Sequence, residues 1–223
     1  MLKGIIFDLD GVICHTDEYH FQAWKRIAEQ EHIHFDREIN NRLRGVSRME
    51  SLEIILEKAG RTYTQVEKTA LAEQKNNYYR ELLGQMTPAD LAEETKEVLH
   101  TLRQWGLKLA IGSSSKNTRL ILGRIGLGEF FDAISDGNNI VNTKPDPEVF
   151  LKAAQMLELP PRDCLVVEDA QAGIQAANSG GFRSAAIGDA RKSEQATFKL
   201  DAMKQLPELI LKIYASTQAT QIK

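Results

Sequence analysis

Residues 4–11 read Gly4-Ile5-Ile6-Phe7-Asp8-Leu9-Asp10-Gly11, a short apolar run that ends in two aspartates and a glycine. An apolar run of this length, followed at once by polar turn residues, indicates a β-strand buried on both faces of a sheet. Asp8 and Asp10 are two residues apart, so an extended backbone points both side chains the same way. Gly11 permits the sharp turn that follows. The stretch predicts two carboxylates that face one pocket at the end of a buried strand.

Three later segments repeat this pattern of an apolar run that ends in polar residues. They are 107–112 before the serines 113–115, 164–167 before Glu168-Asp169, and 184–187 before Gly188-Asp189. Helical patterns at about 118–125, 147–157 and 171–179 follow the βαβα order that is typical of a parallel sheet. We therefore predict an α/β fold with a Rossmann-like parallel-sheet core.

Residues 15–88 contain no comparable strand and show only helical periodicity, as at Phe21, Trp24, Ile27 and Ala28. Because this segment follows the first strand directly, it leaves the sheet at the carboxyl end of that strand. We predict an inserted all-helical cap domain that covers this end. The predicted domains are a discontinuous core of residues 1–14 and 89–223 and a cap of residues 15–88.

The composition narrows the classes of function. With 223 residues, of which 42% are hydrophobic, the chain can form a core, which excludes a disordered protein. A net charge of −3 lacks the broad basic field of a general nucleic-acid binder. Cys14 and Cys164 form no CxxC pair, and no apolar run approaches the ~18 residues of a membrane span. We predict a cytoplasmic protein with neither a nucleic-acid nor a membrane partner.

The acidic residues at the strand ends indicate a metal. Ligands of open parallel sheets bind beyond the carboxyl ends of the strands, where Asp8, Asp10, Glu168 and Asp169 are expected. Burying four carboxylates together is unfavourable unless a cation neutralises them. Oxygen ligands without nearby histidine or cysteine favour Mg²⁺. A DxD pair on its own is equally consistent with turn acids or a helix cap, so the second acidic pair carries the prediction.

Two further segments suit a phosphate. Residues 113–117 place hydroxyls, free backbone N–H groups and a cation after a strand, although such a run can also be a simple helix N-cap. Lys144 adds a cation in a proline-containing loop, although a lone lysine is normally a solvated surface charge. The sequence contains no GxxxxGK[ST], GxGxxG, GxSxG or HExxH motif. Phosphoryl transfer through Asp8 fits these residue types best.

Four ordered motifs resemble those of the haloacid-dehalogenase superfamily in its phosphate-transferring form. They are 7–20, with the DxDG sequence, Ser113, 144–147 and 168–174, so the resemblance covers essentially the whole chain. The resemblance implies that Asp8 is a nucleophile that becomes an aspartyl phosphate and that Asp10 is the general acid and base.

Residues 18–24, 44–48, 75–76 and 115–117 further resemble the β-phosphoglucomutases, which are isomerases of that superfamily. The implied reaction interconverts β-glucose 1-phosphate and glucose 6-phosphate, with glucose 1,6-bisphosphate as intermediate and activator. The implied partner is a small sugar phosphate, and the protein is expected to be a monomer.

The resemblance also implies a set of site residues. Magnesium ligands are Asp8, the backbone carbonyl of Asp10 and Asp169, with Glu168 in support. The transferring phosphoryl group would contact Ser113, Ser114 and Lys144, and the second phosphate Arg48, Ser115, Lys116 and Asn117. Thr16 and His20 would position Asp10 on cap closure. Other expected substrate contacts are Trp24, Arg44, Gly45, Val46, Ser47, Ser51 and Lys75. An isolated helix histidine is more often structural, and Trp24 and Val46 could instead be packing residues.

Two alternatives remain open. A mutase needs two phosphate sites because a bisphosphate must bind in both orientations, whereas a sugar-phosphate phosphatase needs one, which makes Arg48 diagnostic. A non-catalytic phospho-sugar sensor gives no reason to keep both Asp8 and Asp10. His15 and Arg44 replace an acid and a lysine usual in the family. Because arginine offers a planar fork in place of a point charge, the hexose and its anomer stay open.

Overall fold

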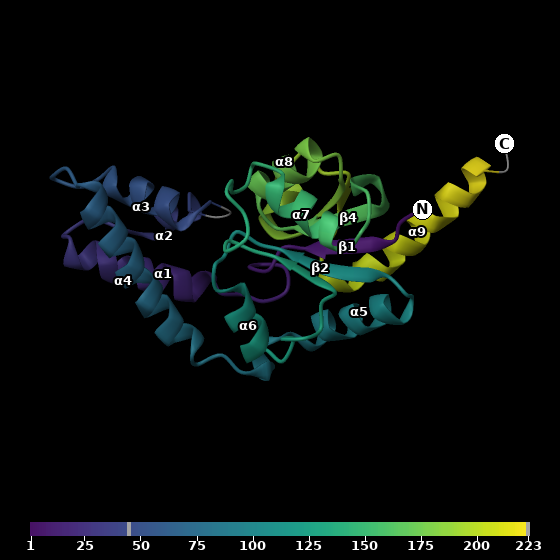
Figure 1. Ribbon diagram of the computed structural model, residues 1–223, viewed down its shortest axis with the longest axis horizontal. Helices are drawn as coiled ribbons and strands as arrows, with labels where there is room; N and C mark the ends of the chain where they lie inside the picture. The colour runs from purple at the N-terminus through teal and green to yellow at the C-terminus, as the bar shows by residue number, and fades with distance from the viewer. Residues whose placement is uncertain (44–45, 222–223) are drawn as a thin grey trace.

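The computed structural model describes residues 1–43 and 46–221 and has two parts, an α/β core and a smaller helical part (Figure 1). The core strands are β1 (Gly4–Phe7), β2 (Lys108–Gly112), β3 (Ala133–Ser135), β4 (Cys164–Glu168), β5 (Arg183–Ala186) and β6 (Phe198–Lys199). Its α-helices are α5 (Glu93–Gln104), α6 (Thr118–Arg124), α7 (Glu148–Met156), α8 (Gln171–Ser179) and α9 (Leu206–Gln221). The helical part contains α1 (Asp17–Gln30), α2 (Arg37–Asn41), α3 (Arg48–Leu56) and α4 (Gln65–Leu83).

The six strands form one parallel sheet in the order β3-β2-β1-β4-β5-β6. Strand β1 is central: Gly4 lies opposite Lys108 of β2 and opposite Cys164 of β4. The chain builds the sheet outward from β1 on one side and then on the other, which opens a crevice beyond the carboxyl end of β1. This arrangement confirms the predicted Rossmann-like core.

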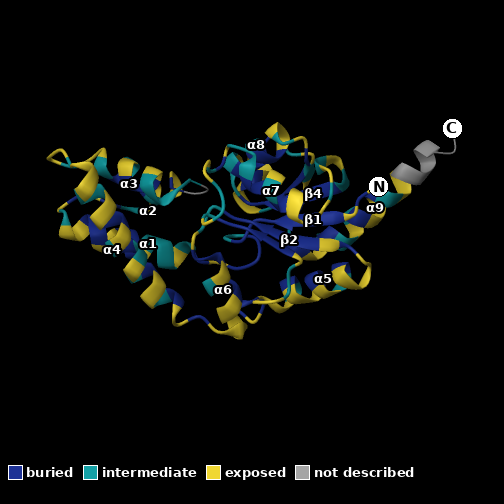
Figure 2. Cartoon of the chain, viewed as in Figure 1, coloured by how far each residue is buried: buried dark blue, intermediate teal, exposed yellow. Residues whose placement is uncertain are grey.

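Helices cover both faces of the sheet, with α5, α6 and α9 on one face and α7 and α8 on the other (Figure 1). Successive strand residues point to opposite faces, so Ile5 and Phe7 join one apolar cluster and Ile6 joins the other. All three side chains are fully buried, as the dark colour of the central strands shows (Figure 2). Burial on both faces is why β1 reads as a continuous apolar run and not as an alternating one.

The helical part has an apolar core of its own. Trp24 and Ile27 of α1 pack with Leu52 and Ile55 of α3, all nearly or fully buried. Residues 17–43 and 46–83 contain no strand, as expected, while the domain limits of 15–88 stay a prediction. None of the helices in the described part of the chain is long and apolar enough to span a membrane.

Candidate active site

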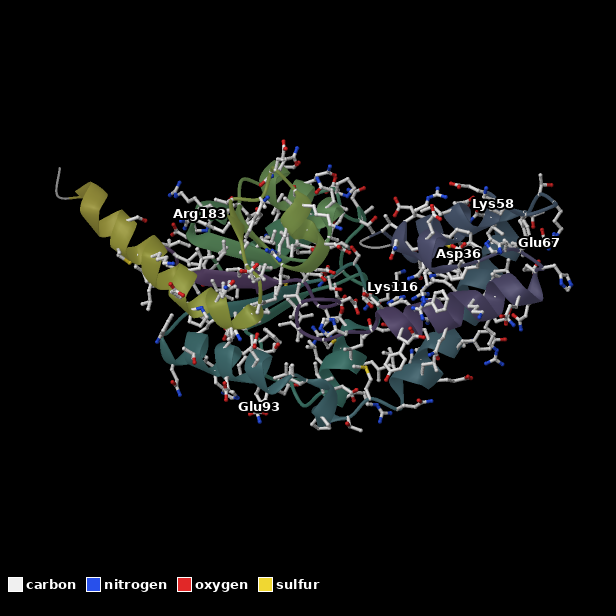
Figure 3. All side chains as sticks on the ribbon, turned by 180° about the vertical axis from the view of Figure 1, so that it is seen from behind. Asp36, Lys58, Glu67, Glu93, Lys116 and Arg183 are labelled. Atoms are coloured by element: carbon white, nitrogen blue, oxygen red, sulfur yellow. The ribbon has the colours of Figure 1, made fainter. Side chains whose placement is uncertain are left out.

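A cavity of about 1130 Å³ lies where the carboxyl end of the sheet faces the cap. Every described residue assigned to the site from the sequence lines it except Thr16, which is buried just behind. Lys116, labelled in Figure 3, lies where the core meets the cap. Arg44 and Gly45 lie outside the described residues. The described residues that the sequence assigned to the site therefore come together around one cavity, while the role of each residue stays a prediction.

A buried lysine joins the two acidic strand ends. Lys144 Nζ lies 2.5 Å from Asp8 Oδ1 and 2.7 Å from Glu168 Oε1, and its side chain is only 2% exposed. Burial alone would lower the pKa of Lys144, but the two carboxylates raise it above its usual range. The ammonium therefore stays charged and fixes both acids. Lys144 is not the solvated surface lysine that a lone lysine usually is.

Three of the acids form a candidate metal centre. Asp8, Glu168 and Asp169 are buried, and each offers a carboxylate oxygen within 4.8 Å of the others. One lysine does not neutralise three buried carboxylates, so a divalent cation would stabilise the group, and an oxygen-only donor set suits Mg²⁺. Asp10 contributes no side-chain oxygen to this cluster; its predicted contribution is through the backbone carbonyl. These residues fit Mg²⁺ as the sequence predicted.

Two glycines make room for these carboxylates. A Cβ on Gly11, whose φ is +84°, would lie 2.2 Å from Asp169 Oδ2. A Cβ on Gly173 in α8 would lie 1.8 Å from Glu168 Oε1. Both distances are far inside van der Waals contact, so each acid occupies the space that a side chain would fill. The sequence indicated a turn at Gly11, but nothing in it explained Gly173.

Burial also shifts the pKa of both DxD aspartates. Burial raises the pKa of Asp8 to about 7, with Lys144 opposing this rise and Glu168 adding to it. Burial likewise raises the pKa of Asp10, against the effect of the Thr16 hydroxyl, which donates a hydrogen bond to Asp10 Oδ1. A raised pKa brings Asp10 closer to the neutral range in which a carboxyl can both give and take a proton.

The serine run organises the loop before α6. Ser113 Oγ accepts a hydrogen bond from the Ser115 N–H at 3.1 Å, and Ser115 Oγ accepts one from the Asn117 N–H at 3.2 Å. The prediction that the run leaves its backbone N–H groups free is therefore wrong for Ser115 and Asn117, because the serines fold back onto them. The Ser114 hydroxyl is buried and has no hydrogen-bond partner among the described residues, so it can donate to a ligand.

Two basic side chains, the buried Lys75 and the half-buried His20, meet on the cap side of the cavity. Lys75 Nζ lies 2.9 Å from His20 Nδ1 and sits over the rings of Trp24 and Tyr79 at 4.9 and 4.4 Å from their centroids. Burial lowers the pKa of both His20 and Lys75; the charge of Arg48 lowers both further, and that of Lys75 also lowers the pKa of His20. Trp24 thus packs in the cap core and also faces the amine of Lys75.

Side-chain hydrogen bonds connect the cap to the core, and no sequence motif indicated which residues form them. Asn76 Oδ1 accepts hydrogen bonds from Arg48 Nη2 at 2.9 Å and from Asn117 Nδ2 at 2.8 Å. Thr143 Oγ1 donates to Glu50 Oε2 at 3.1 Å. Asn76 lay in a segment that resembles the mutases, but Glu50 and Thr143 had no signal, because ordinary surface residues do not reveal their partners.

Comparison with known proteins shows the family of the chain. A family model described as haloacid dehalogenase-like hydrolase matches residues 2–181. The chain belongs to the haloacid dehalogenase-like hydrolase family. The predicted resemblance, fold class and superfamily are confirmed.

Within this haloacid dehalogenase-like family, the chain is similar to mutases and to phosphatases. It is 47% identical to a β-phosphoglucomutase of Bacillus subtilis (strain 168) over 84% of each chain. It is 31% identical to a phosphorylated carbohydrates phosphatase of Thermotoga maritima, over 81% of this chain and 82% of that protein. The crystal structure of a β-phosphoglucomutase from Clostridium difficile matches with a TM-score of 0.91 and 37% identity, over 98% of this chain and 100% of that one.

Gly173→Ala tests the close packing against Glu168. Alanine normally stabilises a helix by about 1 kcal/mol relative to glycine, but here its methyl group would displace the Glu168 carboxylate. We expect a lower melting temperature and Mg²⁺ binding weakened at least about tenfold, measured by calorimetry. Gly123→Ala in α6 is the control, because a Cβ there meets nothing within 4 Å. Unchanged Mg²⁺ affinity in Gly173→Ala would contradict the assignment of Glu168.

The pKa of Asp8 predicts how metal binding depends on pH. In the metal-free folded protein Asp8 keeps its proton up to about pH 7, against its usual 3.8. The protonation of Asp8 therefore contributes fully to the folding stability of the metal-free protein below pH 3.8, and this contribution is lost as the pH rises through 7. Mg²⁺ needs the ionised carboxylate, so its affinity should be about tenfold higher at pH 8 than at pH 6.

Thermal melting with and without Mg²⁺ at the two pH values measures this effect. Mg²⁺ should raise the melting temperature more at pH 8 than at pH 6. Asp8→Asn, which keeps one oxygen ligand but has no proton to lose, should remove the difference. Equal stabilisation by Mg²⁺ at both pH values in the unsubstituted protein would count against a protonated Asp8.

Proposed function

We propose that this protein is a β-phosphoglucomutase that interconverts β-D-glucose 1-phosphate and glucose 6-phosphate. The observation that carries the proposal is a cavity lined by two groups of phosphate-compatible side chains. In the first group Lys144 lies beside the nucleophile Asp8; in the second, Arg48 and Asn117 share one hydrogen-bond acceptor, and Lys116 precedes Asn117 in the chain. A phosphatase needs only the first group. The 47% identity to a β-phosphoglucomutase supports the same conclusion.

The first half of the reaction moves a phosphoryl group onto or off Asp8. A carboxylate oxygen of Asp8 forms a bond to phosphorus while the bond from phosphorus to the sugar oxygen breaks. Asp10 donates its proton to the departing oxygen, and in the reverse direction it takes the proton of the attacking hydroxyl. Lys144 and the Ser114 hydroxyl offset the charge of the phosphoryl oxygens. Bound Mg²⁺ would add positive charge at the same place.

The second half of the reaction requires the intermediate to turn around. Phosphorylated Asp8 gives its phosphoryl group to the 6-hydroxyl of β-glucose 1-phosphate, which yields glucose 1,6-bisphosphate. Reoriented, the bisphosphate returns its 1-phosphoryl group to Asp8, and glucose 6-phosphate leaves. We propose glucose 1,6-bisphosphate as intermediate and activator on this ground, because it supplies the phosphoryl group that primes Asp8.

The state and location of the protein are part of the proposal. We propose that the active unit is a monomer. Cys14 and Cys164 are free thiols that are buried, which supports a reducing cytoplasm.

A sugar-phosphate phosphatase is the second candidate, favoured by the 31% identical phosphatase. The two reactions differ in what accepts the phosphoryl group, a sugar hydroxyl or water. Cap closure decides between them, because an aspartyl phosphate shielded from water is not hydrolysed.

The deciding assay mixes the protein with Mg²⁺, a trace of glucose 1,6-bisphosphate and each anomer of glucose 1-phosphate separately. We expect glucose 6-phosphate from the β anomer, none from the α anomer, and little inorganic phosphate. Coupled dehydrogenase and phosphate-release assays measure the two products. Inorganic phosphate equal to the substrate consumed would favour the phosphatase instead.

Arg48→Ala tests the second phosphate site. Loss of one charge-assisted hydrogen bond should raise the KM for β-glucose 1-phosphate about 10- to 100-fold. Transfer from acetyl phosphate, which has no second phosphate, should fall much less. Arg42→Ala is the matched control, since Arg42 is a half-exposed cap arginine that pairs with Glu57 outside the cavity. An equal loss with both donors would contradict a separate second site.

A further inference from the structure

One oxygen atom joins the cap to the core across the cavity. Asn76 projects from α4, and its side-chain oxygen accepts one hydrogen bond from Arg48, the first residue of α3, at 2.9 Å. The same oxygen accepts a second bond from Asn117, in the core loop before α6, at 2.8 Å. Both bonds are partly buried. Two cap helices and one core loop therefore meet at a single acceptor.

The two donors are the groups that the proposed function assigns to the second phosphate, and the inference rests on that function. They converge on a neutral amide oxygen. A phosphate oxygen is negatively charged, so it accepts both bonds more strongly than the amide oxygen does. We propose that Asn76 is a positioning residue that holds Arg48 and Asn117 together in the place of a phosphate oxygen and yields both donors when ligand binds.

The surroundings of Asn76 explain why such an acceptor is needed. Its neighbour Lys75 is a buried amine, Arg48 is partly buried, and Lys116 lines the same cavity. The charges of Arg48 and Lys75 repel each other, while Glu73 acts on Arg48 and Asp10 acts on Lys75 in the opposite sense. A guanidinium without an acceptor would also leave partly buried donors unsatisfied. The Asn76 oxygen supplies that acceptor without adding a charge that the phosphate would have to displace.

The same contact favours the closed arrangement of the cap. A second bridge, Thr143 Oγ1 to Glu50 Oε2 at 3.1 Å, joins α3 of the cap to the core loop that carries Lys144. With both bridges formed, the cap rests on the core. Phosphate then replaces an acceptor in an existing arrangement, so less of its binding energy is spent on closing the cap.

Two substitutions at Asn76 should move the cap in opposite directions. Asn76→Asp places a charged oxygen at the same position, which strengthens the hydrogen bond from Asn117 of the core and closes the cap further. Asn76→Ala removes the acceptor and opens it. When inorganic phosphate is added stepwise as the probe, the cap of Asn76→Ala should close. The cap of Asn76→Asp should respond little, and this variant should bind phosphate about tenfold more weakly.

Energy transfer between two dyes reports cap closure. Val66→Cys on the cap and Lys192→Cys on the core provide exposed attachment sites, while Cys14 and Cys164 are buried and stay unlabelled. Asn77→Asp and Asn77→Ala are the controls, because Asn77 is the next residue of α4 and is exposed. Thermal melting verifies that each variant is folded.

The direction in which energy transfer changes in each variant, measured before phosphate is added, decides the outcome. Opposite shifts for the two Asn76 variants, with no shift for the Asn77 variants, support the proposal. Shifts in the same direction, or no shift at Asn76, overturn it, even if Asn76→Asp weakens phosphate binding by charge repulsion alone. Because the ligand-free measurement contains no substrate, it is independent of the reaction. Absence of mutase activity would overturn the proposed function and leave this result standing.

Discussion

The ion pairs of Lys144 with Asp8 and Glu168 are the interaction on which the site depends. A buried charge is strongly unfavourable unless an opposite charge is fixed beside it. The fold meets this condition by placing the carboxyl ends of β1 and β4 side by side and directing the turn that carries Lys144 between them. Gly11 and Gly173 then leave space for the carboxylates themselves. Lys144 alone does not neutralise the three carboxylates once they are ionised, which is why the proposed Mg²⁺ suits this site.

The cap, unlike the charged site, is held together by apolar packing. Its helices share an apolar core around Trp24 and Leu52, and side-chain hydrogen bonds through Asn76 and Glu50 join the cap to the α/β core. Apolar packing is cohesive and keeps the cap in one shape. Polar contacts exchange readily with water or with a ligand, whereas Ala23, Tyr79 and Leu83 also join the cap to the apolar cluster of the core. A phosphotransferase needs this combination, because substrate must enter and water must then be excluded.

How far each element could be predicted follows from its burial and length. The four residues of β1 are buried on both faces, which produces an apolar run that no amphipathic helix would show. Strands β3 and β6 have three and two residues, too few for any periodic pattern, and were missed. In the site, chemistry-bearing residues at strand ends were predictable. The contact between Asn76 and Asn117 was not, because asparagines have no pattern that indicates a partner.

By itself, the sequence determined which residues end the buried strands, which side chains bring charge to that edge, and that a helical segment interrupts the sheet after its first strand. These properties are local, since each depends on the order of neighbouring residues. Only the tertiary structure decided which groups meet. Asp8 and Lys144 are 136 positions apart, and their contact depends on the sheet order and on a turn whose path no local pattern specifies. The same holds for Asn76, which gains Asn117 as a partner only when the cap rests on the core.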